Sequence, residues 1–399
     1  MNRLSPLKTA NSTSGLLSRL LLAVFFVVNL SVAKAQVVTG ASRFEIYLQE
    51  LKGKKVGIVA NPTSIVNGTH LVDTLLALGV QIEVVFAPEH GFRGEAEAGE
   101  TVNSGVDAKT GVKVVSLYGN HKKPTSDDLK GVNQLVFDVQ DVGVRFYTYI
   151  STLQYVMEAC AALEIPVMVL DRPNPNGHYV DGPVLKKQYA SFVGMQPIPV
   201  VHGMTMGEYA SMLNGEGWLE DSLRCRLKVV QMKNWTHATD YSLPVPPSPN
   251  LPNDAAVRLY PSLCFFEGAD VSVGRGTDFP FQCFGFPGNK SGDFKFTPLS
   301  IPGKAKNPPY LNQECNGKNL SKNAAIKRYD KLHLEWLIEA YNSFAVKEKF
   351  FNAFFLKLAG TPELQQQIEA GMSAEEIRAG WKTDLEKFQK IRSRYLLYP

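Results

Sequence analysis

The sequence lacks the patterns that mark the commonest cofactor and nucleophile sites. No G-x-G-x-x-G follows the first apolar run, and no G-x-x-x-x-G-K-S/T occurs, so the phosphate cradles of dinucleotide-binding and P-loop folds are excluded. No G-x-S-x-G turn occurs, which argues against a serine nucleophile of the α/β-hydrolase type. The histidines never stand four positions apart on a helical pattern, so we expect neither a zincin-type metal site nor a cofactor.

Cysteine is scarce and widely spaced. The five cysteines include no C-x-x-C pair and no metal-ligand spacing. Buried free thiols are expected for Cys160 and Cys225, because both stand in apolar patterns. A disulfide between Cys264 and Cys283 is left open, since an exported chain can form one although five is an odd number.

Acidic residues are missing from the first 44 positions, where the sequence has the order of a secretory signal. Three basic residues precede a short apolar run at 20–28, and Ala33-Lys34-Ala35 follows it. The run is shorter than the roughly 20 residues of a membrane-spanning helix, so an uncleaved anchor is the less favoured alternative. We expect residues 1–35 to be a signal peptide and the mature protein to be periplasmic or secreted.

The charge of the chain is small. The 399 residues carry a formal charge of +4, and removal of residues 1–35 leaves about zero. A protein without net charge has no general attraction for nucleic acid or anionic lipid. We therefore expect it to bind no nucleic acid and to have no stable membrane association after cleavage. The remaining length, about 364 residues, exceeds the usual size of one core and predicts two domains.

Short apolar runs alternate with helical patterns in the first half of the chain. Runs rich in Val and Ile occur at 56–60, 82–87, 112–117, 134–139 and 166–170. Such runs are expected of strands buried on both faces. Because helical patterns at 71–78 and 148–163 lie between them, we predict an α/β fold with a Rossmann-like, mostly parallel sheet.

The rest of the chain is less regular. A helix is expected at 205–219 and a strand at 224–230, and the tail predicts helices at 332–341, 347–358, 362–370 and 384–397. We therefore predict a catalytic domain at 36–290 and a smaller α+β domain at 291–399 that closes the cleft.

Polar residues follow four of the predicted strands at the point where each ends. They are Asn61; Glu89, His90 and Arg93; Asp138, Gln140, Arg145 and Tyr147; and Asp171, Arg172 and Asn174. Singly, each could cap a helix or hold a loop, but the carboxyl ends of parallel strands share one edge, which predicts a lined cleft. Carboxylates, arginines, amides and aromatics suit sugar chemistry. A metal site built from His90, Asp138 and Asp171 is the less favoured alternative.

Seven segments in order carry a resemblance to one bacterial family. They are VGIVANPTS, FAPEHGFRGEAEAGE, FDVQDVGVRFYTYI, LDRPNPNG, PSPNLP, YPSLCFFEGADVSVGRGTDFPF and IPGKAKNPPYLNQEC. The chain resembles the NamZ-like exo-β-N-acetylmuramidase family from about residue 45 to 399. The resemblance implies release of non-reducing terminal N-acetylmuramic acid from peptidoglycan fragments during cell wall turnover.

The resemblance also assigns a catalytic acid. The family's glutamate in E-H-G-F-x-G matches Glu89, the expected general acid, and His90 follows it as in the pattern. We group Asp171 with these two as catalytic, although Asp138 and Glu267 compete for the place of the second carboxylate. If the acetamido group of the sugar attacks instead, no second nucleophile is needed.

Substrate-binding residues are expected around that acid. A guanidinium fork fits the lactyl carboxylate that distinguishes muramic acid from glucosamine, so we expect it to be bound by one of Arg93, Arg145, Arg172 and Arg275. Amides that could read hydroxyls or the acetamido group are Asn61, Gln140 and Asn174. Tyr147 or an aromatic from 279–286 is expected to stack on the sugar.

Two other functions use the same features. A periplasmic muropeptide-binding protein would also have two lobes and a polar cleft, but it gives no reason for an acid beside a histidine on a glycine-flanked turn. An esterase or amidase would need a nucleophile that the sequence does not show.

The export signal yields a direct prediction. Protein recovered from its native host should begin at Gln36 and lie outside the cytoplasm, because the basic, apolar and A-x-A regions occur in signal-peptide order. N-terminal sequencing decides it. A soluble cytoplasmic protein that begins at Met1 would contradict the prediction.

Overall fold

A computed structural model describes residues 1, 5, 36–94, 104–326 and 328–399. Residues Val38–Pro399 form one compact unit. The signal predicted at 1–35 lies outside the described residues, apart from Met1 and Ser5, as does the 95–100 part of the family motif. Within the described part of the chain, no helix is both long and apolar enough to cross a membrane.

A seven-stranded sheet forms the first half of this unit, in the order β5-β6-β4-β1-β7-β8-β9. All neighbouring pairs are parallel except the edge pair β5–β6. The strands are β1 Lys55–Ala60, β4 Gln81–Ala87, β5 Gly105–Val106, β6 Lys113–Ser116, β7 Gln134–Asp138, β8 Val167–Leu170 and β9 Leu227–Val230. The predicted α/β class and its mostly parallel sheet are therefore confirmed.

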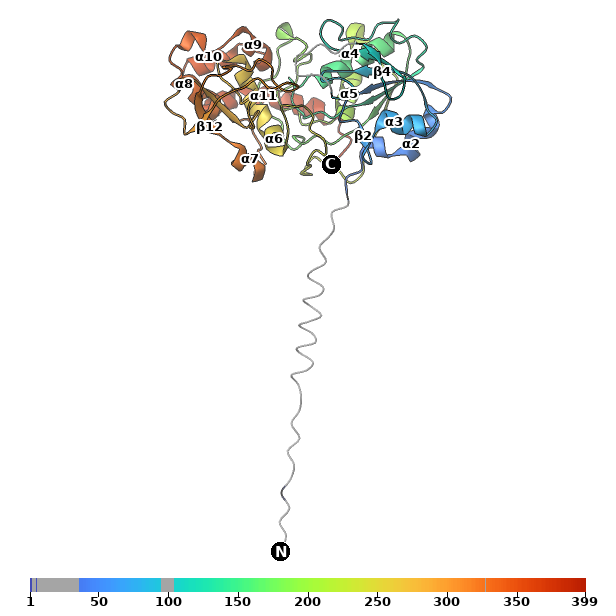
Figure 1. The fold of residues 1–399 in the computed structure, drawn as a ribbon, viewed down its shortest axis with the longest axis horizontal. Coiled ribbons are helices and arrows are strands. Elements are labelled where there is room, and N and C mark those ends of the chain that lie inside the picture. Colours follow the sequence, from blue (N-terminus) through green and yellow to red (C-terminus); the bar gives the residue numbers. More distant parts are fainter. Residues whose placement is uncertain (2–4, 6–35, 95–103, 327) are drawn as a thin grey trace. The chain divides into compact units, whose positions relative to one another are not determined.

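The central strands of the sheet are buried on both faces, which explains why they are largely apolar. Alternate residues of a strand point to opposite faces. Val59 and its neighbour Phe86 join the core beneath α4 (Tyr149–Ala162) and α5 (Met206–Glu216). Ile58 and Val85, one position earlier on each strand, join the core beneath α2 (Phe44–Leu51) and α3 (Leu71–Ala77). Figure 1 shows α2 and α3 together.

A smaller domain follows, as predicted, with a three-stranded antiparallel sheet in the order β10-β12-β11. Its strands are β10 Cys283–Phe286, β11 Phe294–Phe296 and β12 Cys315–Asn319. The helices around it are α6 Asp254–Leu263, α7 Ser321–Ile326, α8 Leu334–Ser343, α9 Ala353–Ala359, α10 Glu363–Glu369 and α11 Ala374–Arg392. The boundary at 290 stays a prediction, and β10 begins before it.

The last helix differs from its predicted range of 384–397. Helix α11 begins ten residues earlier, after Ser373, whose hydroxyl accepts from the Glu376 N–H while the Glu376 carboxylate accepts from the Ser373 N–H. This capping box was readable as S-x-x-E. Arg392 ends the helix, and Tyr398 packs into the interior.

The cysteines are buried free thiols, as expected for Cys160 and Cys225. The Cys264–Cys283 disulfide left open by the sequence is not formed. Cys283 instead shares a small apolar cluster with Cys315 and Phe296.

One buried cation joins the two domains. Arg145 has no exposed surface and donates to the carbonyls of Pro183 and Ile198 at 2.8 and 2.7 Å, and to those of Leu358 and Ala359 at 2.8 Å each. The last two carbonyls end helix α9. Burial lowers the pKa of Arg145 to about 9, and carbonyl oxygens aimed at the guanidinium favour its charged form.

Replacing Arg145 should therefore destabilise the fold. In Arg145→Met, four buried carbonyls lose a charged donor, and among the described residues only that of Ile198 keeps another one, the Leu185 N–H, so we expect the free energy of unfolding to fall by about 3 kcal/mol or more. Urea unfolding measures it, with Arg226→Met as the control. Arg226 is exposed, and a surface substitution should change stability by less than about 0.5 kcal/mol. Equal stabilities of the two variants would contradict the role given to Arg145.

Candidate active site

A cavity of about 460 Å³ lies where loops at the carboxyl ends of the sheet strands face the smaller domain. This volume is within the range of roughly 300–1,000 Å³ that is usual for small-ligand sites. Its lining consists of Glu89, His90, Tyr118, Gly119, Lys122, Phe146, Tyr147, Thr148, Phe192, Val193, Ser248, Leu251, Tyr260, Cys264, Glu267, Arg275, Phe281, Phe354 and Leu358. Aromatic rings and a few charged groups dominate it, as in sites that bind sugars.

Glu89 enters this cavity from a tight turn after β4. His90 and Gly91 both have positive φ angles, 72° and 78°. A positive φ costs energy in a non-glycine residue and is common at functional sites. The half-buried Glu89 carboxylate accepts a hydrogen bond from the Thr148 hydroxyl at 3.4 Å. The strained turn therefore presents Glu89 and His90 side by side on the cavity wall.

Asn61 supports that turn from behind. Its amide donates to the Tyr149 hydroxyl at 2.9 Å, and this hydroxyl donates to the Glu89 carbonyl at 3.3 Å. The Asn61 side-chain oxygen accepts from the Thr63 N–H at 2.9 Å. Asn61 is thus buried and linked to the position of Glu89 through one tyrosine.

The smaller domain contributes a second carboxylate to the same cavity. Glu267 accepts from Arg275, with its oxygen 2.9 Å from Nε and 2.7 Å from Nη2. The guanidinium also lies 4.9 Å from the centre of the Phe281 ring. The structure therefore brings Glu89, His90, Tyr147, Glu267 and Arg275 together, with Phe281 from the predicted aromatic loop.

Asp138 and Arg172 lie beneath the strand ends and bind each other. Two hydrogen bonds of 2.6 and 2.8 Å join the carboxylate to the guanidinium, and both side chains are buried. Arg172 also donates to the Ile65 carbonyl at 3.3 Å. Asp138 and Arg172 therefore neutralise each other within the protein. A buried pair of this kind is costly to break.

Asp171 is fully buried under the start of α5. It accepts from the Thr205 and Tyr398 hydroxyls, both at 2.7 Å, and from the Gly207 N–H at 2.9 Å. Burial raises the pKa of Asp171 to about 6. Its oxygens thus hold together a helix start and the C-terminal tail.

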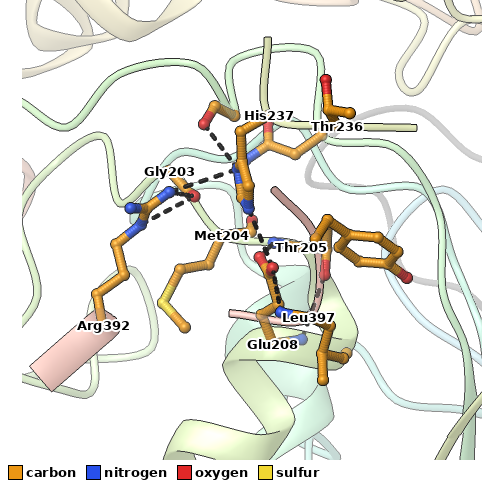
Figure 2. A network of polar contacts seen from close by, with 12 residues as sticks. Gly203, Met204, Thr205, Glu208, Thr236, His237, Arg392 and Leu397 are labelled. Atoms are coloured by element: carbon orange, nitrogen blue, oxygen red, sulfur yellow. Dashed lines mark hydrogen bonds and ion pairs between the residues drawn. The ribbon is translucent and has the colours of Figure 1, made fainter. Parts of the chain in front are cut away.

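The first turn of α5 also binds the C-terminal tail through the carboxylate of Glu208. Figure 2 shows the Glu208 carboxylate between the Leu397 N–H at 2.9 Å and the His237 ring at 3.0 Å. Arg392 donates to the Gly203 carbonyl at 2.6 Å nearby. Glu208 and Arg392 therefore fix the C-terminal tail, whose Tyr398 donates to Asp171.

The remaining predicted residues also bind within the protein. Arg93 pairs with Asp107 at 2.7 Å and Asp73 at 2.9 Å. The amides of Gln140 and Asn174 donate to the Pro173 and Met204 carbonyls at 2.6 and 2.8 Å, and Arg145 binds the four carbonyls described above. Tyr147 lines the cavity while its hydroxyl donates to the Pro247 carbonyl at 2.6 Å. Their substrate roles stay predictions.

Several cavity residues were not foreseen. Tyr118, Lys122 and Phe192 come from loops that carry no motif recognised in the sequence, whereas Thr148 lies inside the FDVQDVGVRFYTYI segment. A further acid, Asp141, is buried in the same segment. Burial raises its pKa to about 7; one oxygen accepts from the Gly143 N–H at 2.6 Å, and the other has no hydrogen-bond partner among the described residues.

A metal site is not apparent in the part of the chain that the structure describes. No group of three His, Cys, Asp or Glu side chains there is arranged to hold an ion. His90, Asp138 and Asp171 have the separate surroundings given above.

Comparison with known proteins agrees with this architecture. The family models "Exo-beta-N-acetylmuramidase NamZ, N-terminal" and "Exo-beta-N-acetylmuramidase NamZ, C-terminal" match residues 56–255 and 258–398. The peptidoglycan beta-N-acetylmuramidase NamZ of Bacillus subtilis (strain 168) is 41% identical over 373 residues, which cover 88% of this chain and 89% of that protein.

Two crystal structures of DUF1343 family proteins from Bacteroides fragilis NCTC 9343 share the fold. The first has a TM-score of 0.84 and 47% identity, and the second a TM-score of 0.74 and 29% identity. Each match covers 91% of this chain and 99% of the other.

The pKa shift of Asp141 predicts an unusual pH dependence of stability. Because its folded pKa is raised, native Asp141 favours folding at low pH, and that contribution is lost as the pH rises from about 4 to 7. The stability of Asp141→Asn relative to the native protein should therefore rise over this range, by about 1.4 kcal/mol for each pH unit. Urea unfolding at pH 5 and pH 8 measures the difference.

Asp107→Asn provides a control whose pH dependence lies outside the range measured. The Arg93 guanidinium beside Asp107 lowers the pKa of that carboxyl. Its contribution to stability is complete above about pH 4 and is lost only in stronger acid, so the stability of this variant relative to the native protein should be the same at pH 5 and pH 8. A change between pH 5 and pH 8 that is as large for Asp107→Asn as for Asp141→Asn would refute the account of Asp141.

Proposed function

The chain belongs to the NamZ family of exo-β-N-acetylmuramidases and is a glycoside hydrolase, and we propose that Glu89 is its general acid. We further propose that it releases non-reducing terminal N-acetylmuramic acid from peptidoglycan fragments. The observation that supports this most directly is the position of Glu89. It stands on a strained turn, in a cavity that also holds aromatic rings and a second carboxylate.

The chemistry assigned to Glu89 is proton donation. Cleavage of a glycosidic bond leaves electrons on the departing oxygen, and a carboxylic acid beside that oxygen donates the proton that completes the new hydroxyl. Thr148 donates to the Glu89 carboxylate and Tyr149 to its backbone carbonyl. Both contacts keep the acid in one place, and positioning of this kind is a large part of catalysis.

Glu267 is the second carboxylate of the proposed site. Arg275 holds one of its oxygens in an ion pair, and the Cys264 thiol donates to the other at 3.5 Å. The carboxylate is thereby fixed at the cavity wall, where it can orient the acetamido group or a hydroxyl of the sugar. Phe281 and Tyr147 supply rings to pack against the sugar face. Asp138 and Asp171 are left out of this assignment, because their oxygens are occupied by Arg172 and by the start of α5.

The place of action follows from the substrate. We propose that the protein works outside the cytoplasm, in the periplasm or secreted, where peptidoglycan fragments arise during cell wall turnover. The signal-like order of residues 1–35 supports this location.

A muropeptide receptor without catalysis is the competing function. Purified protein incubated with 4-nitrophenyl β-N-acetylmuraminide separates the two. Release of nitrophenol under multiple-turnover conditions is expected of the hydrolase, whereas tight binding without product would establish the receptor.

Glu89→Gln tests the acid itself. The amide has nearly the shape of the carboxyl group, so folding and sugar binding should persist. It cannot donate the proton, and general acid–base catalysis is worth about 10²–10⁴-fold, so kcat on a natural disaccharide should fall by that factor. With a nitrophenolate leaving group, which needs less protonation, the loss should be smaller.

Glu83→Gln is the matched control, because Glu83 lies on the same strand and its carboxylate binds Gln81. This variant should retain native rates on both substrates. A folded Glu89→Gln protein with native rates on both substrates would remove Glu89 from the mechanism.

A further inference from the structure

The cavity contains a cation that has no ion-pair partner among the described residues. Besides His90, the lining has one arginine and one lysine, and Arg275 is neutralised by Glu267. The other is Lys122, whose ammonium lies 4.9 Å from the centre of the Phe192 ring. Among the residues that the structure describes, no carboxylate is within ion-pair distance of Lys122. A ring attracts an ammonium group without removing its charge.

Lys123, the next residue in the same loop, has a structural role. Lys123 also faces a ring, 5.9 Å from the centre of Tyr155. Unlike Lys122, it pairs with two carboxylates, Glu158 at 2.9 Å and Glu220 at 2.5 Å. Lys123 thus ties the loop to the domain, whereas the adjacent lysine is directed to the cavity lining.

The loop holds Lys122 between anchored neighbours. On one side, His121 contacts the Asp128 carboxylate at 2.9 Å, and on the other side Lys123 is paired as described. Phe192 is in turn stacked on Tyr155, with the ring centres 5.8 Å apart and the planes at 21°. A cation placed in this way loses little freedom when an anion binds, which increases affinity.

We propose that Lys122, seated on Phe192, binds the lactyl carboxylate of N-acetylmuramic acid and so determines the preference for this sugar. The inference rests on the proposed function. N-acetylglucosamine has the same ring and acetamido group but no carboxylate, so an unpaired cation in the cavity separates the two sugars by charge. The four arginines expected to fill this role each have partners within the protein.

The test removes the charge of Lys122 in the protein and, separately, the charge of the lactyl group in the substrate. The substrates are 4-nitrophenyl β-N-acetylmuraminide and the same glycoside with its lactyl carboxyl group converted to a methylamide. For Lys122→Met, we expect kcat/KM on the carboxylate substrate to fall roughly 10- to 100-fold, the usual effect of losing a hydrogen bond to a charged group. On the methylamide, the variant and the native enzyme should be alike.

The loss should lie mainly in KM, because the lactyl group takes no part in the bond cleavage. Lys122→Arg should restore most of the preference. Lys130→Met is the control for net charge, since Lys130 is exposed and does not line the cavity, and its kcat/KM should equal that of the native enzyme on both substrates. Equal melting temperatures show that the variants are folded.

Failure of the inference is distinguishable from failure of the proposed function. A native enzyme that cleaves neither substrate overturns the proposed function and the inference with it. If the native enzyme prefers the carboxylate substrate and Lys122→Met keeps that preference, the inference alone is wrong. An equal loss on both substrates would also overturn it, because the lysine would then act independently of the lactyl charge.

Discussion

The buried guanidinium of Arg145 is the contact on which the site geometry depends. It is bound by carbonyls from both domains. The chain segment that follows Arg145 and helix α9, which carries two of these carbonyls, both line the cavity. Phe146, Tyr147 and Thr148 follow Arg145 directly, while Leu358 belongs to α9, which also carries Phe354. Because one side chain spans these two walls, it sets the separation between the turn that carries Glu89 and the helix opposite. The cost of burying an unpaired charge is offset by four well-directed carbonyl dipoles.

The sheet was predictable because its physical signature is local. Strands buried on both faces must be apolar throughout, and the alternation of Ile58 and Val59 between two cores shows why. The turn of Glu89 was also predictable, since glycines flank it and it follows such a strand. The missed start of α11 has a different cause: its first turns are rich in charged residues, and only the Ser373–Glu376 capping box signals them.

The directions of the polar side chains after the strands could not be predicted. Asn61, Asp138, Asp171 and Arg172 share the edge that bears Glu89, yet their side chains turn inward and satisfy one another, the turns or the tail. Which way a side chain turns depends on partners distant in sequence, such as Tyr398 for Asp171. The loop lysine Lys122 was passed over for the same reason, because its distance from the carboxylates of the described residues depends on how the chain folds.

The contact between Glu208 and Leu397 bears on the order in which the protein can mature. The two residues are separated by 189 positions, so the ribosome must add that many residues before the start of α5 gains its last hydrogen bonds. During synthesis, the larger domain therefore remains incomplete at this helix long after its own strands have emerged. A chain in that state is more easily held unfolded by a carrier protein, as the export proposed above would require.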